Sequence, residues 1–262
     1  MLRFQAIAVA IILSAALSAP AQTPPPNPSA QTIDLHTIIQ RVDEAARTNG
    51  THFRPYVLTR EYRLYGSDVQ KPSSEVVAEV NFVPPATKDF KILQSSGSSR
   101  GESIVRKLLE NEQKAATDGH ARGSITSDHY EFAYLGESSV DHHDCYLLKL
   151  TPRHEDKTLI DGRAWVDKAT YRVRRVEGEM SKLPSWWLKS VHVVLTFEEV
   201  DGMWMQNHTK AVAQVRIFGP HTFVSDMVSY HAGDTVAQNR GIKARKKNAA
   251  ADVIGAAIMH DR

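Results

Sequence analysis

The sequence is poor in the motifs that mark an enzyme. It contains no His-Glu-x-x-His metal motif and no glycine-rich loop of the kind that cradles phosphate groups. Asp and Glu residues are plentiful, but their spacing marks no pair of them as an acid and base couple. These absences favour a protein that is not an enzyme and that uses no cofactor.

The chain also lacks a large excess of charge of one sign. Its 32 Lys and Arg residues nearly balance its 30 Asp and Glu residues. The small positive excess lies in residues 237–262, which hold six basic and two acidic residues, so the rest of the chain is slightly acidic. We therefore expect no nucleic-acid partner. The tail is predicted to be solvated and disordered, with an Arg245-Lys246-Lys247 run able to contact anionic lipid.

A hydrophobic run of membrane-spanning length is missing at the N-terminus. The apolar stretch Ile7–Leu17 is too short to cross a bilayer. It follows Arg3 and precedes Ala19-Pro20-Ala21, and this order is typical of a cleavable signal peptide. We therefore expect a signal peptide over residues 1–21, a Pro-rich linker over residues 22–30, and a soluble periplasmic protein.

Cysteine is nearly absent, since Cys145 is the only one in 262 residues. No disulfide can form within the chain, although the predicted export leads to an oxidising compartment. Stability must therefore come from buried apolar surface. Because an exposed thiol would risk oxidation, we expect Cys145 to be buried on a strand rather than to act in catalysis.

Two segments have the apolar spacing of amphipathic helices. The first covers residues 32–49, with Asp34 near its start and Gly50 as its stop. The second covers Glu102 to about Thr117, where Ser98 or Ser99 is placed to cap the first turn. Both helices are predicted to have one apolar face.

Most of the remaining sequence alternates apolar and polar residues, as strands with one buried face do. Turns are predicted near Asp141–Asp144 and at Asp201-Gly202, and Gly219-Pro220 is expected to break the strand that starts at Met203. Consecutive strands joined by short turns form an antiparallel meander. Residues 31–236 are therefore predicted to form one mainly β (α+β) domain, a curved antiparallel sheet with helices covering its concave face.

Large aromatic side chains are spread over the predicted strands and bends. Where the helices leave space, such side chains line an apolar ligand cavity, and where they do not, the same side chains pack the core. The candidate cavity-lining residues are Tyr62, Phe82, Phe132, Trp165, Trp186 and Trp187. For the bend Leu183–Leu188 we favour insertion of its Trp residues into the core over contact with a lipid or membrane surface.

One turn gathers metal-ligating residue types, because Asp141–Cys145 contains two imidazoles, two carboxylates and the thiol. Adjacent side chains on an extended strand point to opposite faces, so His142 and His143 would not easily reach one ion together. We therefore expect a polar hairpin turn here and no metal site.

Several strand motifs resemble the bacterial outer-membrane lipoprotein-sorting family, the LolA and LolB-like proteins. They lie in Tyr130–Glu137, Cys145–Pro152, Gly162–Asp167, Val176–Gly178, Pro184–Trp187 and Gln214–Gly219. The resemblance implies a half-open β-barrel with a helical lid over an apolar cavity that holds acyl chains or other lipid-like ligands. It implies no enzyme activity, and no motif places the family's ligand-gating arginine in this chain.

Together these features predict a periplasmic binding or carrier protein for a lipid-like apolar ligand, with lipoprotein acyl chains as the favoured cargo. Transient contact with a membrane surface is compatible with this function. The alternative is a non-enzymatic interaction or sensor module of the cell envelope, with a filled core and a protein partner.

Overall fold

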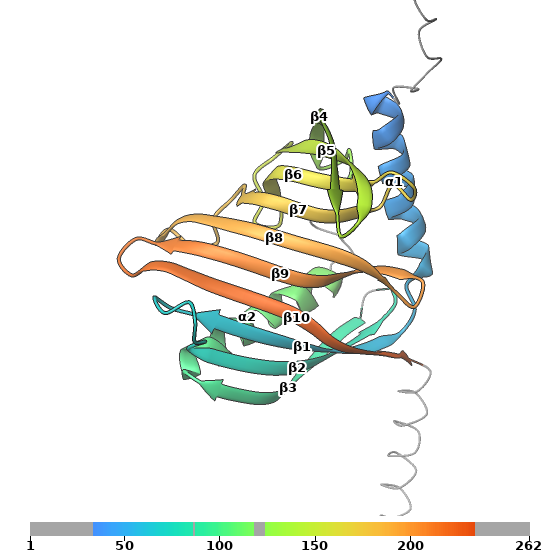
Figure 1. Ribbon diagram of the computed structural model, residues 1–262. Coiled ribbons are helices and arrows are strands. Elements are labelled where there is room, and N and C mark those ends of the chain that lie inside the picture. The colour runs from blue at the N-terminus through green and yellow to red at the C-terminus, as the bar shows by residue number, and fades with distance from the viewer. Residues whose placement is uncertain (1–33, 86, 118–123, 234–262) are drawn as a thin grey trace, which may run out of the picture. The chain divides into compact units, whose positions relative to one another are not determined.

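The computed structural model describes residues 34–85, 87–117 and 124–233 (Figure 1). The predicted signal peptide, linker and basic tail lie outside the described residues. The elements are α1 (Leu35–His52), β1 (Tyr56–Tyr65), β2 (Ser74–Val83), β3 (Thr87–Gly97), α2 (Ser99–Thr117), β4 (Tyr130–Val140), β5 (His143–Pro152), β6 (Ile160–Asp167), β7 (Val173–Met180), β8 (Leu188–Val200), β9 (Met203–Val215) and β10 (Gly219–Ala232). Within the described residues, neither helix is long and apolar enough to span a membrane.

All ten strands belong to one antiparallel sheet, in the order β3-β2-β1-β10-β9-β8-β7-β6-β5-β4. The sheet consists of two meanders, β1–β3 and β4–β10, which are joined where β1 pairs with β10. In the described part of the chain the outer strands β3 and β4 do not pair, so the curved sheet stays open (Figure 1). The predicted fold class, a curved antiparallel sheet with two helices, is confirmed.

Helix α1 is held to the sheet by the apolar stripe that its sequence predicts. Ile38 and Val42 are buried against Tyr146, Leu148 and Val166, which are inward-facing residues of β5 and β6. The burial of these side chains accounts for the position of the helix, since an isolated helix of this length is marginal in water.

The expected stop of α1 at Gly50 is wrong, because the helix continues to His52. A glycine inside a helix costs only about 1 kcal/mol relative to alanine, so tertiary contacts can override it. The Asn49 side chain supplies such contacts: its Nδ2 donates to the Trp204 carbonyl at 2.9 Å, and its Oδ1 accepts from the Trp204 amide at 2.7 Å.

Helix α2 covers the meander β1–β3. The Ser98 hydroxyl accepts a hydrogen bond from the Arg100 amide at 3.3 Å, which confirms the cap predicted at Ser98 or Ser99. Val105 and Leu109 are buried in one cluster with residues of β2, including Val80. The helix starts three residues earlier than predicted, at Ser99.

Two tight turns use positive φ angles at both of their central residues. Asp141 and His142 have φ angles of 49° and 65°, and Asp201 and Gly202 have φ angles of 52° and 77°. Such turns match the twist of an antiparallel hairpin. Both predicted turns are therefore confirmed, and each directly joins two neighbouring strands.

The strand that starts at Met203 does not extend to Gly219-Pro220, where its break was predicted, but ends at Val215. The turn lies earlier, at residues 216–218, and Gly219 with a φ of 74° begins β10. Proline is tolerated near the start of a strand, so Pro220 does not stop β10 from pairing with β9. The sequence pattern alone therefore placed this turn too late.

Candidate functional site

A cleft of about 620 Å³ lies between α2 and the inward face of the sheet. It is lined by Phe53, Tyr56, Leu58, Arg60, Tyr62, Val80, Phe82, Lys88, Leu108, Glu112, Ala115, Ala116, Leu195, Phe197, Trp204, Met205, Gln206, Thr209, Phe223 and Ser225. Most of these side chains are apolar or aromatic. The volume and lining are typical of a site for a small apolar ligand.

The cleft is built from both meanders of the sheet. Strands β1 and β2 supply one side, and strands β8, β9 and β10 supply the other. From α2, Leu108, Glu112 and the small residues Ala115 and Ala116 face the cleft at helical spacing. The alanines leave space under the last turns of the helix, whereas Val105 and Leu109 fill the space under its earlier turns.

Aromatic rings form much of the wall. Tyr56 and Phe82 have ring centroids 5.1 Å apart, and those of Tyr62 and Phe223 are 6.0 Å apart. Burial raises the pKa of Tyr56 to about 12, because removal from water disfavours the phenolate. Burial also raises the pKa of Tyr62. Both phenols therefore stay neutral at physiological pH.

One guanidinium group lies in this mostly apolar wall. Arg60 occupies an inward position of β1, between Leu58 and Tyr62 in the alternation of the strand. Its Nη1 donates to the Ser225 hydroxyl at 3.2 Å, and its Nη2 donates to the Gln206 carbonyl. Sequence reasoning missed Arg60, although its place in an otherwise apolar alternation was a signal that could have found it.

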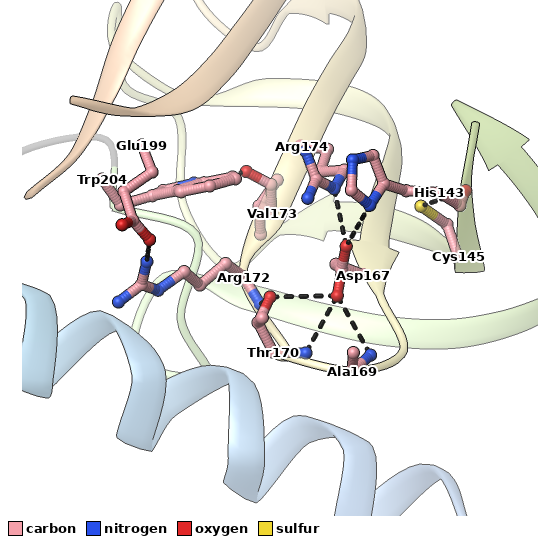
Figure 2. A network of polar contacts seen from close by, with 10 residues as sticks. All are labelled: His143, Cys145, Asp167, Ala169, Thr170, Arg172, Val173, Arg174, Glu199 and Trp204. Atoms are coloured by element: carbon pink, nitrogen blue, oxygen red, sulfur yellow. Dashed lines mark hydrogen bonds and ion pairs between the residues drawn. The ribbon is translucent and has the colours of Figure 1, made fainter. Parts of the chain in front are cut away.

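Trp204 closes one side of the cleft and is held from several directions (Figure 2). Its indole Nε1 donates to the Val173 carbonyl at 2.8 Å. The guanidinium groups of Arg172 and Arg174 lie 5.4 Å and 5.2 Å from its ring centroid. With the backbone contacts to Asn49 described above, these interactions fix the ring that borders the cleft.

The Arg174 guanidinium is in turn bound to the buried carboxylate of Asp167 (Figure 2). Asp167 Oδ2 accepts from Arg174 Nε at 2.6 Å and lies 3.3 Å from His143 Nδ1. Its Oδ1 accepts from the Ala169 and Thr170 amides at 3.0 Å and 2.9 Å. Asp167 therefore links the β6–β7 turn to the arginine that contacts Trp204.

The electrostatics of Asp167 follow from these contacts. Burial alone would raise its pKa, but the hydrogen bonds from Arg174 and Thr170 outweigh burial and hold the pKa below its ordinary value. The neighbouring Cys145 is buried, as predicted, and its burial raises the pKa of the thiol. A raised pKa keeps the thiol protonated and unreactive.

Two of the six predicted cavity residues, Tyr62 and Phe82, line the cleft. Phe132 instead packs against the buried clusters of β4–β8 and of α1. Trp165 alternates with the inward residues Ala164 and Val166, and its ring lies against the guanidinium groups of Arg163 and Arg175. Trp186 and Trp187 lie between β7 and β8 and do not line the cleft.

The expected insertion of Trp186 and Trp187 into the core is wrong. Their exposed fractions are 84% and 45%. The leucines at the two ends of the bend take the inward positions instead: Leu188 is buried, and Leu183 packs against the same apolar cluster. With the bend anchored by its leucines, both indoles remain at the surface.

Sequence reasoning missed one motif, since Gly97–Gly101 has the Gly-x-Ser-x-Gly pattern that some hydrolases use for a nucleophilic serine. The pentapeptide occupies a strand-to-helix turn, from the end of β3 to the start of α2, as such motifs do in hydrolases. In residues 34–85, 87–117 and 124–233, however, no histidine is hydrogen-bonded to Ser99. The same residues contain no group of three or more His, Cys, Asp or Glu side chains that could hold a metal ion.

Comparison with known proteins gives a family without an assigned activity. A family model described only as "Uncharacterized protein" matches residues 85–216, about half of the chain. The chain belongs to this family. The matched region includes α2 and strands β3–β9, and therefore about half of the residues that line the cleft, but not β1, β2 or β10. No curated protein matches the sequence.

Solved structures include several similar chains at low sequence identity. A DUF1329 family protein from Desulfovibrio piger is 17% identical, with a TM-score of 0.39 over 74% of this chain and 92% of the other. A LolA superfamily protein from Nitrosomonas europaea is 16% identical, with a TM-score of 0.36 over 74% and 93% of the two chains. A putative outer membrane lipoprotein-sorting protein domain from Vibrio parahaemolyticus is 15% identical, with a TM-score of 0.39 over 73% and 90%. At these values the three structures assign no ligand or partner to this chain.

Proposed function

We propose that the protein is a non-enzymatic binding protein for a lipid-like ligand, which it holds in the cleft between α2 and the sheet. The observation that supports this most directly is the cleft itself, about 620 Å³ of space with mostly apolar walls. The transfer of an acyl chain from water to such an apolar surface lowers the free energy. An interaction module with a filled core would have no such space.

The single guanidinium in the wall suggests the chemistry of the other end of the ligand. Arg60 donates to two neutral oxygens, and neither partner neutralises its charge. A carboxylate or phosphate at the end of an apolar chain would add a charge-assisted hydrogen bond. The favoured ligand is therefore an amphiphile with an anionic head, and lipid or lipoprotein acyl chains are the favoured cargo.

The place of action that we propose is the bacterial periplasm. Support comes from the signal-peptide pattern of residues 1–21, which lie outside the described residues. In that compartment a carrier would shield acyl chains from water between membranes. A protein partner of the envelope could receive or supply the cargo.

Filling the cleft should abolish ligand binding without unfolding the protein. Ala116→Trp places an indole under α2, where Ala116 lines the cleft. We expect at least about a tenfold loss of affinity for a fluorescent fatty acid, because the probe loses the apolar surface that binds it. Affinity is measured by titration, and native mass spectrometry of the protein purified from a bacterial periplasm identifies any bound lipid.

The matched control for this experiment is Asn111→Trp, on an exposed position of the same helix. It should bind the fatty acid as the wild-type protein does. Wild-type affinity in a folded Ala116→Trp variant would exclude the cleft as the site. A protein that copurifies with no lipid and takes up none would favour the interaction module.

Arg60 should select for the charged head of the ligand. Arg60→Met should weaken binding of a fatty acid by about tenfold, since a hydrogen bond to a charged group contributes about 1.5 kcal/mol or more. Binding of the fatty alcohol of the same chain length should change much less. Isothermal titration calorimetry measures both, with Arg60→Lys as the variant that keeps the charge. Equal losses for acid and alcohol would contradict a role in head-group recognition.

A further inference from the structure

Four large apolar side chains gather on two neighbouring connections at one end of the sheet, and we call them the aromatic tip. Trp186 and Trp187 precede β8, and Ile217 and Phe218 form the β9–β10 turn, at the left-hand edge of Figure 1. Their exposed fractions are 84%, 45%, 85% and 71%. Clustered apolar exposure of this kind marks an interaction surface rather than ordinary scatter of single residues.

The two connections of the aromatic tip are fixed to each other. The Arg216 amide donates to the Trp187 carbonyl at 3.0 Å, and Arg216 Nε donates to the Trp186 carbonyl at 2.8 Å. At the base of the tip, Leu188 pairs with Val215. The apolar side chains are therefore held together outside the core, and none of them lines the cleft.

The charged residues on the two connections of the aromatic tip are basic, whereas Asp156, outside them, is hydrogen-bonded to Ser181 at the start of the first connection. Lys182, Lys189 and Arg216 are exposed, whereas residues 180–191 and 210–225 contain no Asp or Glu. Basic side chains near a membrane surface are attracted to anionic lipid, and each adds about 1 kcal/mol to the binding free energy. Exposed Trp, Phe and Ile side chains beside such charges fit the interfacial region of a bilayer.

We propose that the aromatic tip is a docking site for the surface of an anionic lipid bilayer. Trp186, Ile217 and Phe218 enter the interfacial region, while Lys182, Lys189 and Arg216 face the anionic head groups. This inference uses the outer surface only and does not depend on what the cleft binds. A second copy of the chain would use the same side chains differently, and the experiment separates that case from a bilayer.

The test uses the full-length mature protein and vesicles of phosphatidylglycerol mixed with phosphatidylcholine, with pure phosphatidylcholine for comparison. The tip variant is Trp186→Ser/Ile217→Ser/Phe218→Ser. The control variant is Leu93→Ser/Leu135→Ser/Val228→Ser, which removes exposed apolar side chains away from the tip, with exposed fractions of 48%, 50% and 61%. Binding is measured by cosedimentation and by the blue shift of Trp emission.

We expect the wild-type and control proteins to bind the anionic vesicles, and the tip variant to bind at least about tenfold less tightly. Salt should weaken wild-type binding, because it screens the basic residues. Equal binding by the tip variant, or no vesicle binding by the wild-type protein, overturns the proposal. Wild-type dimers in sedimentation that the tip variant lacks, without vesicle binding, would assign the surface to a second copy and would also overturn it.

Discussion

Asp167→Ala should lower the free energy of unfolding by about 3 kcal/mol, measured by urea denaturation at neutral pH. The carboxylate is nearly fully buried and accepts hydrogen bonds from Arg174, Thr170 and the Ala169 amide. Its removal leaves a largely buried guanidinium and two turn amides without an acceptor. Leaving buried donors without a partner destabilises the folded state by more than their hydrogen bonds had stabilised it.

The same substitution should change the response to acid. Because the folded-state pKa of Asp167 lies below its ordinary value, the charge stabilises the folded state above the ordinary carboxyl pKa, near 3.9. That stabilisation is lost as pH falls through the lower, folded-state value. The wild-type protein should therefore lose more stability than Asp167→Ala as the pH falls below about 5. Asp226, whose pKa is also held below its ordinary value, is present in both proteins and does not contribute to this difference.

Asp167→Asn is the matched control, since its amide oxygen can still accept from the turn amides while the charge is gone. We expect a smaller loss of about 1.5 kcal/mol and the same reduced acid dependence as in the alanine variant. A loss of less than about 0.5 kcal/mol in Asp167→Ala, the range of ordinary surface substitutions, would contradict a central role for this carboxylate.

Gly178→Ala should destabilise the protein by about 3 kcal/mol, because the added methyl group would clash with the backbone of the neighbouring strand rather than with a side chain that can move. Gly178 lies directly opposite Gly162 in the β6–β7 pair. A Cβ atom on Gly178 would lie 2.2 Å from the Asp161 carbonyl oxygen and 2.6 Å from the Gly162 Cα. Neither atom belongs to a side chain that can rotate away, so the two strands must separate.

The control for this substitution is Gly50→Ala, which adds the same methyl group within α1. No atom lies within 4 Å of a Cβ at position 50, and alanine favours the helix over glycine by about 0.5 to 1 kcal/mol. Thermal unfolding should thus move to lower temperature in Gly178→Ala and slightly higher in Gly50→Ala. If both variants unfold at the wild-type temperature, the close approach of β6 and β7 is not tight in solution.

The local pattern of the sequence predicts the elements of the fold well. Alternation identifies the sheet because each strand has one buried face. The burial of Cys145, which directly precedes the inward-facing Tyr146, was predicted instead from the chemistry of its thiol. The 3.6-residue period identifies both helices, although tertiary contacts at Asn49 extend α1 beyond its expected end. Turns with Asp-Gly or Asp-His chemistry are recognised because they need positive φ angles.

The site is less predictable, because its walls come from segments far apart in the sequence. Tyr62 and Phe223 meet across the β1–β10 pair, and nothing in either strand specifies the other as its neighbour. The sequence of β1 shows Arg60 at an inward position, but not that its guanidinium is held by the Gln206 carbonyl and the Ser225 hydroxyl of distant strands. Likewise, the exposure of Trp186 depends on which residues of its bend reach the core.

The pairing of β1 with β10 also determines when the cleft can exist. Residues 56–65 pair with β2 on one side, but their partners on the other side are residues 222–232, near the end of the described chain. Contacts between segments so distant in sequence form late, since a long loop must close first. A nascent chain that has not yet reached β10 therefore has no complete cleft, and we expect the protein to acquire any ligand only after its synthesis and folding are finished.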